Sequence, residues 1–123
     1  MFPERFIPMA RYLMLLHETP AHFAPMSPAE LQAILEEYIQ WSQRLQQEGR
    51  LLQGEKLRDE GGRRLKQQDG QLLVSDGPYA EVKDVVGGFF ILSAESYDAA
   101  VALARTCPHL RHGEVELRAI DEV

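Results

Sequence analysis

Hydrophobic and polar positions along the chain follow three different patterns. Two short runs, residues 11–17 and 87–92, are apolar at nearly every position, which is typical of strands that are buried on both faces. Residues 114–119 instead alternate polar and apolar side chains, as a strand with one buried face does. The third pattern, an apolar residue at every third or fourth position, appears between the first two runs and indicates a helix.

Three further strands are predicted between the helical stretch and the second apolar run. They cover residues 50–57, 63–68 and 71–75. Asp69 and Gly70 separate the last two of them, and Asp-Gly is a favoured dipeptide for a two-residue hairpin turn. We therefore expect a β-hairpin inserted between the central strands.

The long helix is predicted over residues 28–48. Ser27 and Glu30 have the spacing of a capping box, and Pro28 stands at the first helical position. Gly49 follows the last turn, where glycine commonly ends a helix. The apolar face of this helix is expected to lie on the sheet.

A second helix is predicted after Ser96, a residue type that caps helix N-termini, and it is expected to end by Pro108. Small alanines along this helix favour close packing on the sheet. Residues 18–26 contain Pro20 and Pro25 and are predicted to form a loop.

The resulting order is strand, long helix, strand, hairpin, strand, helix, strand. With the hairpin as an insertion, this is a ferredoxin-like βαββαβ arrangement of the α+β class: an antiparallel sheet with both helices on one face. Two helices cover only one face, whereas residues 12–16 and 89–92 are apolar on both. We therefore expect a homodimer in which a second copy covers the other face.

Composition and charge narrow the functional classes. The 123 residues suffice for one domain, and 45% hydrophobic and 26% charged residues are ordinary for a soluble globular protein. A net charge of −6 argues against nucleic acid as a partner, because such binding needs a basic face. No apolar run reaches the length of a membrane span, and no signal peptide precedes the domain, so a cytoplasmic protein without a membrane partner is expected.

The single cysteine, Cys107, excludes an intramolecular disulfide. It follows a predicted helix, whose C-terminal end disfavours a thiolate, so we interpret it as a buried residue and not as a nucleophile. The four histidines lack metal-ligand spacing with cysteine partners, and no nucleotide-binding motif is present. Neither a metal nor a cofactor is expected.

Residues 1–10 carry two prolines and no sustained period. They are predicted to form an irregular N-terminal arm ahead of a single domain at residues 11–123. Two readings of the arm stay open: Met9 is an alternative start, or Phe2 and Phe6 pack on a partner.

The most distinctive stretch is Asp-Gly-Pro-Tyr-Ala-Glu-Val-Lys at residues 76–83, followed by Gly-Gly-Phe-Phe-Ile at 87–91. It resembles the signature of the DGPF group within the YCII-related family, with Tyr79 where that group usually has Phe. The similarity extends through Gly54–Leu57 and residues 107–118. It implies a dimeric α/β-barrel relative of largely unassigned function.

The resemblance also implies a catalytic pairing that this chain lacks. Many YCII-related proteins pair a histidine in the first helix with an aspartate just before the proline that follows the second helix. The corresponding positions here are Tyr38 and Cys107. Acid–base catalysis by that dyad is therefore not expected, and any activity must use other groups.

The candidate catalytic residues are His17, Asp76 and Glu81. If Asp76 and Glu81 converge near the end of the first strand, His17 meets a carboxylate, which raises the pKa of His17 and creates a proton-transfer pair. The alternative is structural: His17 caps a strand end, and the turn at 76–83 only connects two strands.

The candidate ligand-binding residues are Tyr38, Glu55 and Tyr79. Together with the catalytic candidates they predict a small-molecule-binding protein or enzyme with a pocket between the sheet and the signature turn. The alternative is a regulatory or interaction module associated with an extracytoplasmic-function sigma factor, which the resemblance implies because DGPF proteins are often encoded beside such factors.

Overall fold

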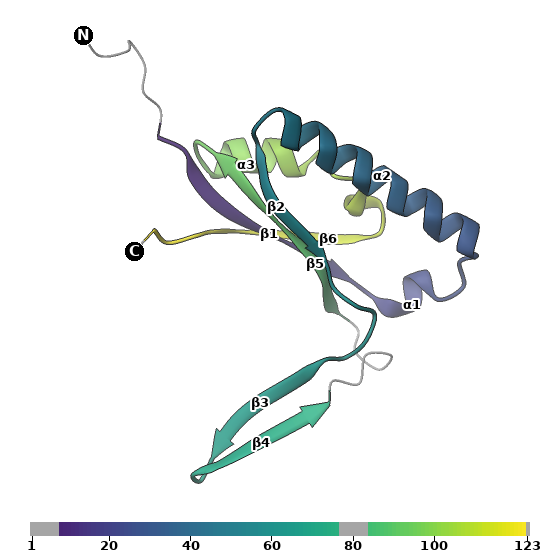
Figure 1. Cartoon of the computed structure of the whole chain (residues 1–123), viewed down its shortest axis with the longest axis vertical. Helices are drawn as coiled ribbons and strands as arrows, with labels where there is room; N and C mark the ends of the chain where they lie inside the picture. The colour runs from purple at the N-terminus through teal and green to yellow at the C-terminus, as the bar shows by residue number, and fades with distance from the viewer. Residues whose placement is uncertain (1–7, 77–83, 123) are drawn as a thin grey trace.

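The structure, a computed structural model, describes residues 8–76 and 84–122. In chain order the elements are β1 (Ala10–Glu18), α1 (Pro20–Phe23), α2 (Pro28–Gln47), β2 (Leu51–Lys56), β3 (Arg63–Gln68), β4 (Gln71–Asp76), β5 (Val85–Ala94), α3 (Tyr97–Ala104), the 3-10 helix η2 (Pro108–Arg111) and β6 (Gly113–Ala119) (Figure 1). Among the described residues, no helix is long and apolar enough to cross a membrane.

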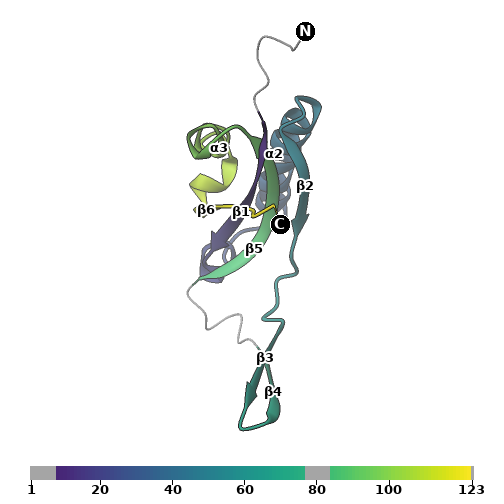
Figure 2. The ribbon, with the colours of Figure 1, turned by 90° about the vertical axis from the view of Figure 1, so that its left-hand side faces the viewer.

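Four strands form the main sheet in the order β2-β5-β1-β6, and every neighbouring pair is antiparallel. The strands β3 and β4 form a separate two-stranded sheet that projects away from it (Figures 1 and 2). The predicted ferredoxin-like α+β fold with an inserted hairpin is therefore confirmed.

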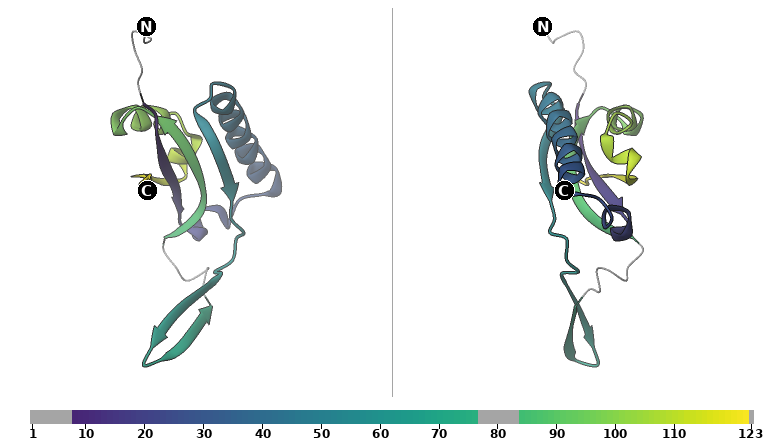
Figure 3. Two further views of the ribbon diagram at one scale, coloured as in Figure 1. Left: turned by 60° about the vertical axis from the view of Figure 1, so that its left-hand side comes forward. Right: turned by 90° about the vertical axis from the view of Figure 1, so that its right-hand side faces the viewer.

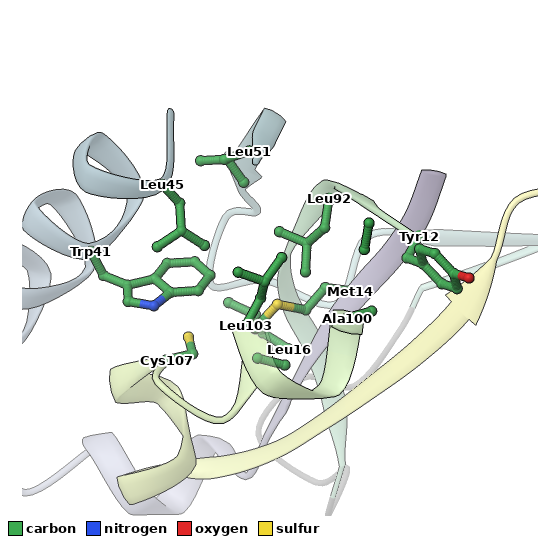
Figure 4. Close-up of a cluster of buried hydrophobic side chains, with 12 residues drawn as sticks. Tyr12, Met14, Leu16, Trp41, Leu45, Leu51, Leu92, Ala100, Leu103 and Cys107 are labelled. Carbon is green, nitrogen blue, oxygen red and sulfur yellow. The ribbon is translucent and has the colours of Figure 1, made fainter. Parts of the chain in front are cut away.

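The hydrophobic core lies between the sheet and both long helices (Figure 4). Successive side chains of a strand point to opposite faces, so Tyr12, Met14 and Leu16 face the helices while Leu13 and Leu15 lie on the other face. The largest members of the core come from strands and helices alike: Tyr12, Met14, Leu16, Trp41, Leu45, Leu51, Leu92 and Leu103. Both helices thus pack on one face of the sheet, as predicted.

Helix α2 begins with the predicted capping box. The Glu30 N–H donates to the Ser27 hydroxyl at 3.1 Å, and the Ser27 N–H donates to the Glu30 carboxylate at 3.4 Å. Gly49, with φ of 74°, follows the last turn in the left-handed conformation that glycine adopts readily. The helix lies alongside β2 (Figure 3).

The two halves of α2 differ in burial. Trp41 and Leu45, in its C-terminal half, are buried in the core. Leu31, Leu35 and Ile39, which lie closer to its N-terminus, are 40%, 39% and 43% exposed. The N-terminal half of α2 therefore stands away from the sheet.

Two short helices were not predicted. Residues 18–26 were expected to be a loop but contain α1, and η2 begins at Pro108, where the sequence predicted only the end of a helix. Proline is tolerated in the first turn because its missing N–H would have no helical partner there. Pro20 and Pro108 each occupy such a position.

The hairpin turn has the geometry that Asp-Gly predicts. Asp69 and Gly70 have φ angles of 52° and 77°, and positive φ at both central residues is the condition for a type I′ turn. Leu65, Leu72 and Val74 on this hairpin are exposed.

Candidate functional site

A cavity of about 1070 Å³ separates the N-terminal half of α2 from the sheet. Its walls come from α1, α2, the strands β1, β2 and β5, and His109 of η2. Most of the lining is apolar, with Phe23, Leu31, Ile34, Leu35, Ile39 and Phe90 as the large side chains.

Glycines form part of the sheet wall of this cavity. Gly54, Gly87 and Gly88 all line it. A Cβ at Gly88 would lie 2.9 Å from the backbone oxygen of Glu55, and one at Gly54 would overlap the Phe90 ring. The close approach of the β2 backbone therefore requires glycine at position 88, whereas glycine at position 54 leaves room for the Phe90 ring.

A hydrogen-bonded pair, Tyr38 and His109, lies in the cavity wall. The Tyr38 hydroxyl is 2.9 Å from His109 Nδ1, and His109 Nε2 is 2.8 Å from the carbonyl oxygen of His17. A carbonyl oxygen only accepts, so Nε2 carries the proton and donates to it. In the neutral imidazole Nδ1 is then the acceptor, and the Tyr38 hydroxyl donates to it.

Burial keeps both members of the pair uncharged near neutral pH. His109 is 1% exposed, and desolvation lowers its pKa, aided by the positive charges of His17 and His22 and opposed by the hydrogen bond to the His17 carbonyl. Burial also raises the pKa of Tyr38, and the negative charge of Glu18 adds to that shift. The pair can therefore exchange hydrogen bonds with a ligand without carrying a charge itself.

Gly113 of β6 allows His109 to approach β1. A Cβ at Gly113 would lie 2.9 Å from His109 Nε2 and would overlap the His17 carbonyl. Any larger residue at this position would therefore displace the hydrogen bond that fixes the His109 tautomer.

Charged residues gather at the strand ends beside the cavity. Burial raises the pKa of Glu18, and the charge of Lys56 opposes that shift. Lys56 Nζ donates to Asp59 Oδ1 at 3.0 Å and to the Leu57 carbonyl at 2.9 Å. Glu18, Lys56 and Asp59 line the cavity together with Glu55.

The imidazole of His17 lies on the opposite face of the sheet, between two carboxylates. Its Nδ1 is 3.0 Å from Asp84 Oδ2, and its Nε2 is 2.8 Å from Glu116 Oε1. Partial burial acts to lower the pKa of His17, but the hydrogen bonds to Glu116 and Asp84 and their negative charges outweigh it, so the pKa is raised. These partners differ from the Asp76 and Glu81 of the sequence hypothesis.

The other predicted site residues fall into two groups. Tyr38 and Glu55 both line the cavity. Asp76 ends β4, where its backbone pairs with Arg63, while Tyr79 and Glu81 lie in segment 77–83, outside the residues that the structure describes. The hypothesis that the turn carries a site therefore stays a prediction.

The resemblance pointed to positions 38 and 107 as the place of the family's dyad, and the structure pairs Tyr38 with His109 instead. Cys107 is 4% exposed, and burial raises its pKa to about 11, so its thiol stays protonated at neutral pH. Sequence reasoning missed His109 because it searched for an acidic residue before Pro108. A sequence feature that could have indicated His109 is its position directly after Pro108, the first residue of a helical turn.

Within residues 8–76 and 84–122, no group of three or more histidine, cysteine, aspartate or glutamate side chains is arranged to hold a metal ion. Two of the histidines contact each other: His22 Nε2 lies 3.0 Å from His112 Nδ1, with the Phe23 ring beside both. The hydrogen bond between His22 and His112 connects α1, which forms one wall of the cavity, to the residue that precedes β6.

Comparison with known proteins agrees with the fold and leaves the activity open. The model of the YCII-related domain matches residues 10–123, which is nearly the whole chain. No curated protein matches the chain. With this match, the antiparallel sheet and the two covering helices, the chain belongs to the YCII-related family.

Proposed function

We propose that this protein binds a small, mostly apolar molecule in the cavity between α2 and the sheet. The observation that carries the proposal is the Tyr38–His109 pair, an uncharged, hydrogen-bonded polar group in a lining that is mostly apolar. Small-molecule sites typically have volumes of about 300–1,000 Å³, an apolar lining and a few fixed polar groups. The cavity of about 1070 Å³ fits that description.

The exposed side chains of α2 support the same proposal. Leu31, Leu35 and Ile39 form one stripe along the helix and line the cavity, although they are about two-fifths exposed. A bound apolar molecule would remove this surface from water, which contributes about 25 cal/mol for each Å² of apolar area.

The segment that resembles the DGPF signature comes shortly before cavity-lining residues in the sequence. Gly87 and Gly88 of β5 line the cavity and come a few residues after that segment. This placement supports the proposal that the turn contributes to ligand binding. No observation on the described residues favours the alternative of a module associated with a sigma factor.

The proposal is tested by NMR titration of the ¹⁵N-labelled protein with a library of small aromatic and aliphatic fragments. Binding fragments should shift the amide signals of Leu31, Leu35 and Phe90, which line the cavity. In the variant Leu35→Trp the larger ring fills the space between α2 and the sheet, and we expect binding to weaken at least tenfold.

Val101→Trp is the matched control, because Val101 is similarly exposed, at 44%, but lies on α3 away from the cavity. It should leave binding unchanged. Fragment shifts confined to residues outside the cavity, or equal binding by Leu35→Trp, would show that the cavity is not a ligand site.

A further inference from the structure

We propose that the polar group of the ligand is a hydrogen-bond donor, an amine or a hydroxyl on an apolar body, and that it binds the oxygen of Tyr38. This inference rests on the proposed function and specifies the chemical class of the ligand. It follows from the direction of the hydrogen bonds in the cavity wall.

The first step is the charge state of His109. Its two ring nitrogens contact a backbone carbonyl and a phenol hydroxyl, neither of which is an anion. The residue is 1% exposed, and a buried cation without an anionic partner carries a large desolvation cost. His109 is therefore neutral, with its one N–H on Nε2, directed at the His17 carbonyl.

The second step is the direction of the Tyr38 hydroxyl. Because Nδ1 of this tautomer is an acceptor, the hydrogen bond of 2.9 Å between Tyr38 and His109 uses the single proton of the phenol. The phenol oxygen is left with lone pairs alone. Toward the cavity Tyr38 thus accepts hydrogen bonds and donates none, which matches an N–H or O–H of a ligand and not a carbonyl.

The charges around the cavity also favour a ligand that donates hydrogen bonds. Three carboxylates, Glu18, Glu55 and Asp59, line it together with one ammonium group, Lys56. Two of the three N–H donors of Lys56 are already used by Asp59 and the Leu57 carbonyl. The excess of negative charge favours a protonated amine and disfavours a carboxylate.

The test compares three ligands that share one skeleton: 4-phenylbutan-2-amine, 4-phenylbutan-2-ol and 4-phenylbutan-2-one. The amine and the alcohol carry donors, and the ketone only accepts. Calorimetric titration of the full chain should show the two donors binding roughly 3- to 10-fold more tightly than the ketone, the effect of one net hydrogen bond. In Tyr38→Phe we expect the preference for the alcohol over the ketone to fall toward one, with the ketone affinity unchanged, while the amine keeps the part of its preference that comes from the carboxylates.

Tyr97→Phe is the control, since the Tyr97 hydroxyl accepts from the Ala119 N–H and is not part of the cavity wall. It should keep the preference for donors. Equal or tighter binding of the ketone by the wild-type protein would overturn the inference and leave the proposed function standing. If neither these ligands nor any library fragment binds in the cavity, the proposed function itself fails.

A second measurement tests the tautomer without any ligand. Long-range ¹H–¹⁵N correlation spectra should show His109 protonated at Nε2 and unprotonated at Nδ1. A proton on Nδ1 would reverse the hydrogen bond to Tyr38 and overturn the inference, whatever the ligand series shows.

Discussion

His17 takes part in two different interactions through two different atoms. Its carbonyl accepts from His109 on the helix side of the sheet, and its imidazole lies between Asp84 and Glu116 on the other side. The β1–β5 register shifts between Leu16 and His17. His17 thus lies at a local irregularity of β1, and its backbone and side chain make hydrogen bonds on opposite faces of the sheet.

The raised pKa of His17 predicts a pH-dependent contribution to stability. The charged imidazole is favoured in the folded state, so its contribution is fully present below the ordinary pKa of 6.5 and is lost as pH rises through the folded value. The side chain is 20% exposed and both carboxylates more so, which limits the effect to about 0.5–1 kcal/mol.

We therefore expect His17→Gln to lower the free energy of unfolding more at pH 6 than at pH 9. Urea denaturation at both values measures the difference. A loss of the same size at both pH values would contradict a charged His17 held by Asp84 and Glu116.

At the residue scale, the sequence hypothesis paired His17 with Asp76 and Glu81, and it stays a prediction because segment 77–83 lies outside the described residues. A carboxylate beside His17 was predicted from the nearby signature turn, whereas one partner, Glu116, comes from β6, 99 positions away in the chain. Tyr38 was a candidate ligand contact, but its partner His109 was not. Such pairs depend on strand order and helix docking, which local sequence patterns do not encode.

At the scale of elements, local signals predicted most boundaries. The capping box and Gly49 bounded α2, and Asp69 and Gly70 set the hairpin turn. These signals work because each describes hydrogen bonds or backbone angles within a few residues. Helix α1 was missed because Pro20 and Pro25 were interpreted only as helix breakers, although Pro20 is the first residue of the helix.

The capping box of α2 yields a prediction for this element. Ser27→Ala removes the hydroxyl that accepts from the Glu30 N–H, and we expect a loss of about 0.5–2 kcal/mol in the free energy of unfolding. Ser42→Ala is the matched control, because Ser42 lies within the helix and its hydroxyl only donates to the Ile39 carbonyl. Alanine has the higher helix propensity there, so the control should be neutral or slightly stabilising.

Chemical denaturation followed by circular dichroism compares the two variants. Equal midpoints for Ser27→Ala and the wild-type protein would mean that this cap contributes nothing to the stability of the fold.

For the whole molecule, the face of the sheet opposite the helices supports the expectation of a homodimer. Leu13 pairs with Ile91 and Leu15 with Phe89 across β1 and β5, and all four are partly exposed. Stable dimers commonly bury more than about 1,000 Å² through such apolar surfaces. We propose that a second copy covers this patch.

Sedimentation equilibrium at micromolar concentration should therefore show a dimer. Leu15→Arg places a charge in the patch and should shift the protein toward the monomer, whereas Leu110→Arg, at an exposed position on η2, should not. A wild-type protein that sediments as a monomer would exclude this dimer, independently of how the variants fold.

The fold could be predicted from the sequence more fully than the site. The apolar strands β1 and β5 and the cavity beside α2 show the reason. Two runs that are apolar at nearly every position indicate burial on both sides, whatever provides the cover. The cavity arises instead because the N-terminal half of α2 stands away from the sheet while Trp41 and Leu45 hold its other half. No periodicity in the helix distinguishes those two halves.

The hydrogen bonds of His109 also have a consequence for the order in which the chain folds. They join it to Tyr38 across 71 positions and to His17 across 92, and contacts of such long range form only after large loops have closed. During synthesis β1 and α2 emerge before η2, so Tyr38 at first has no His109 imidazole to bind. The Tyr38–His109 pair is thus formed late in folding, and the proposed ligand site is incomplete until η2 has docked on β1 and α2.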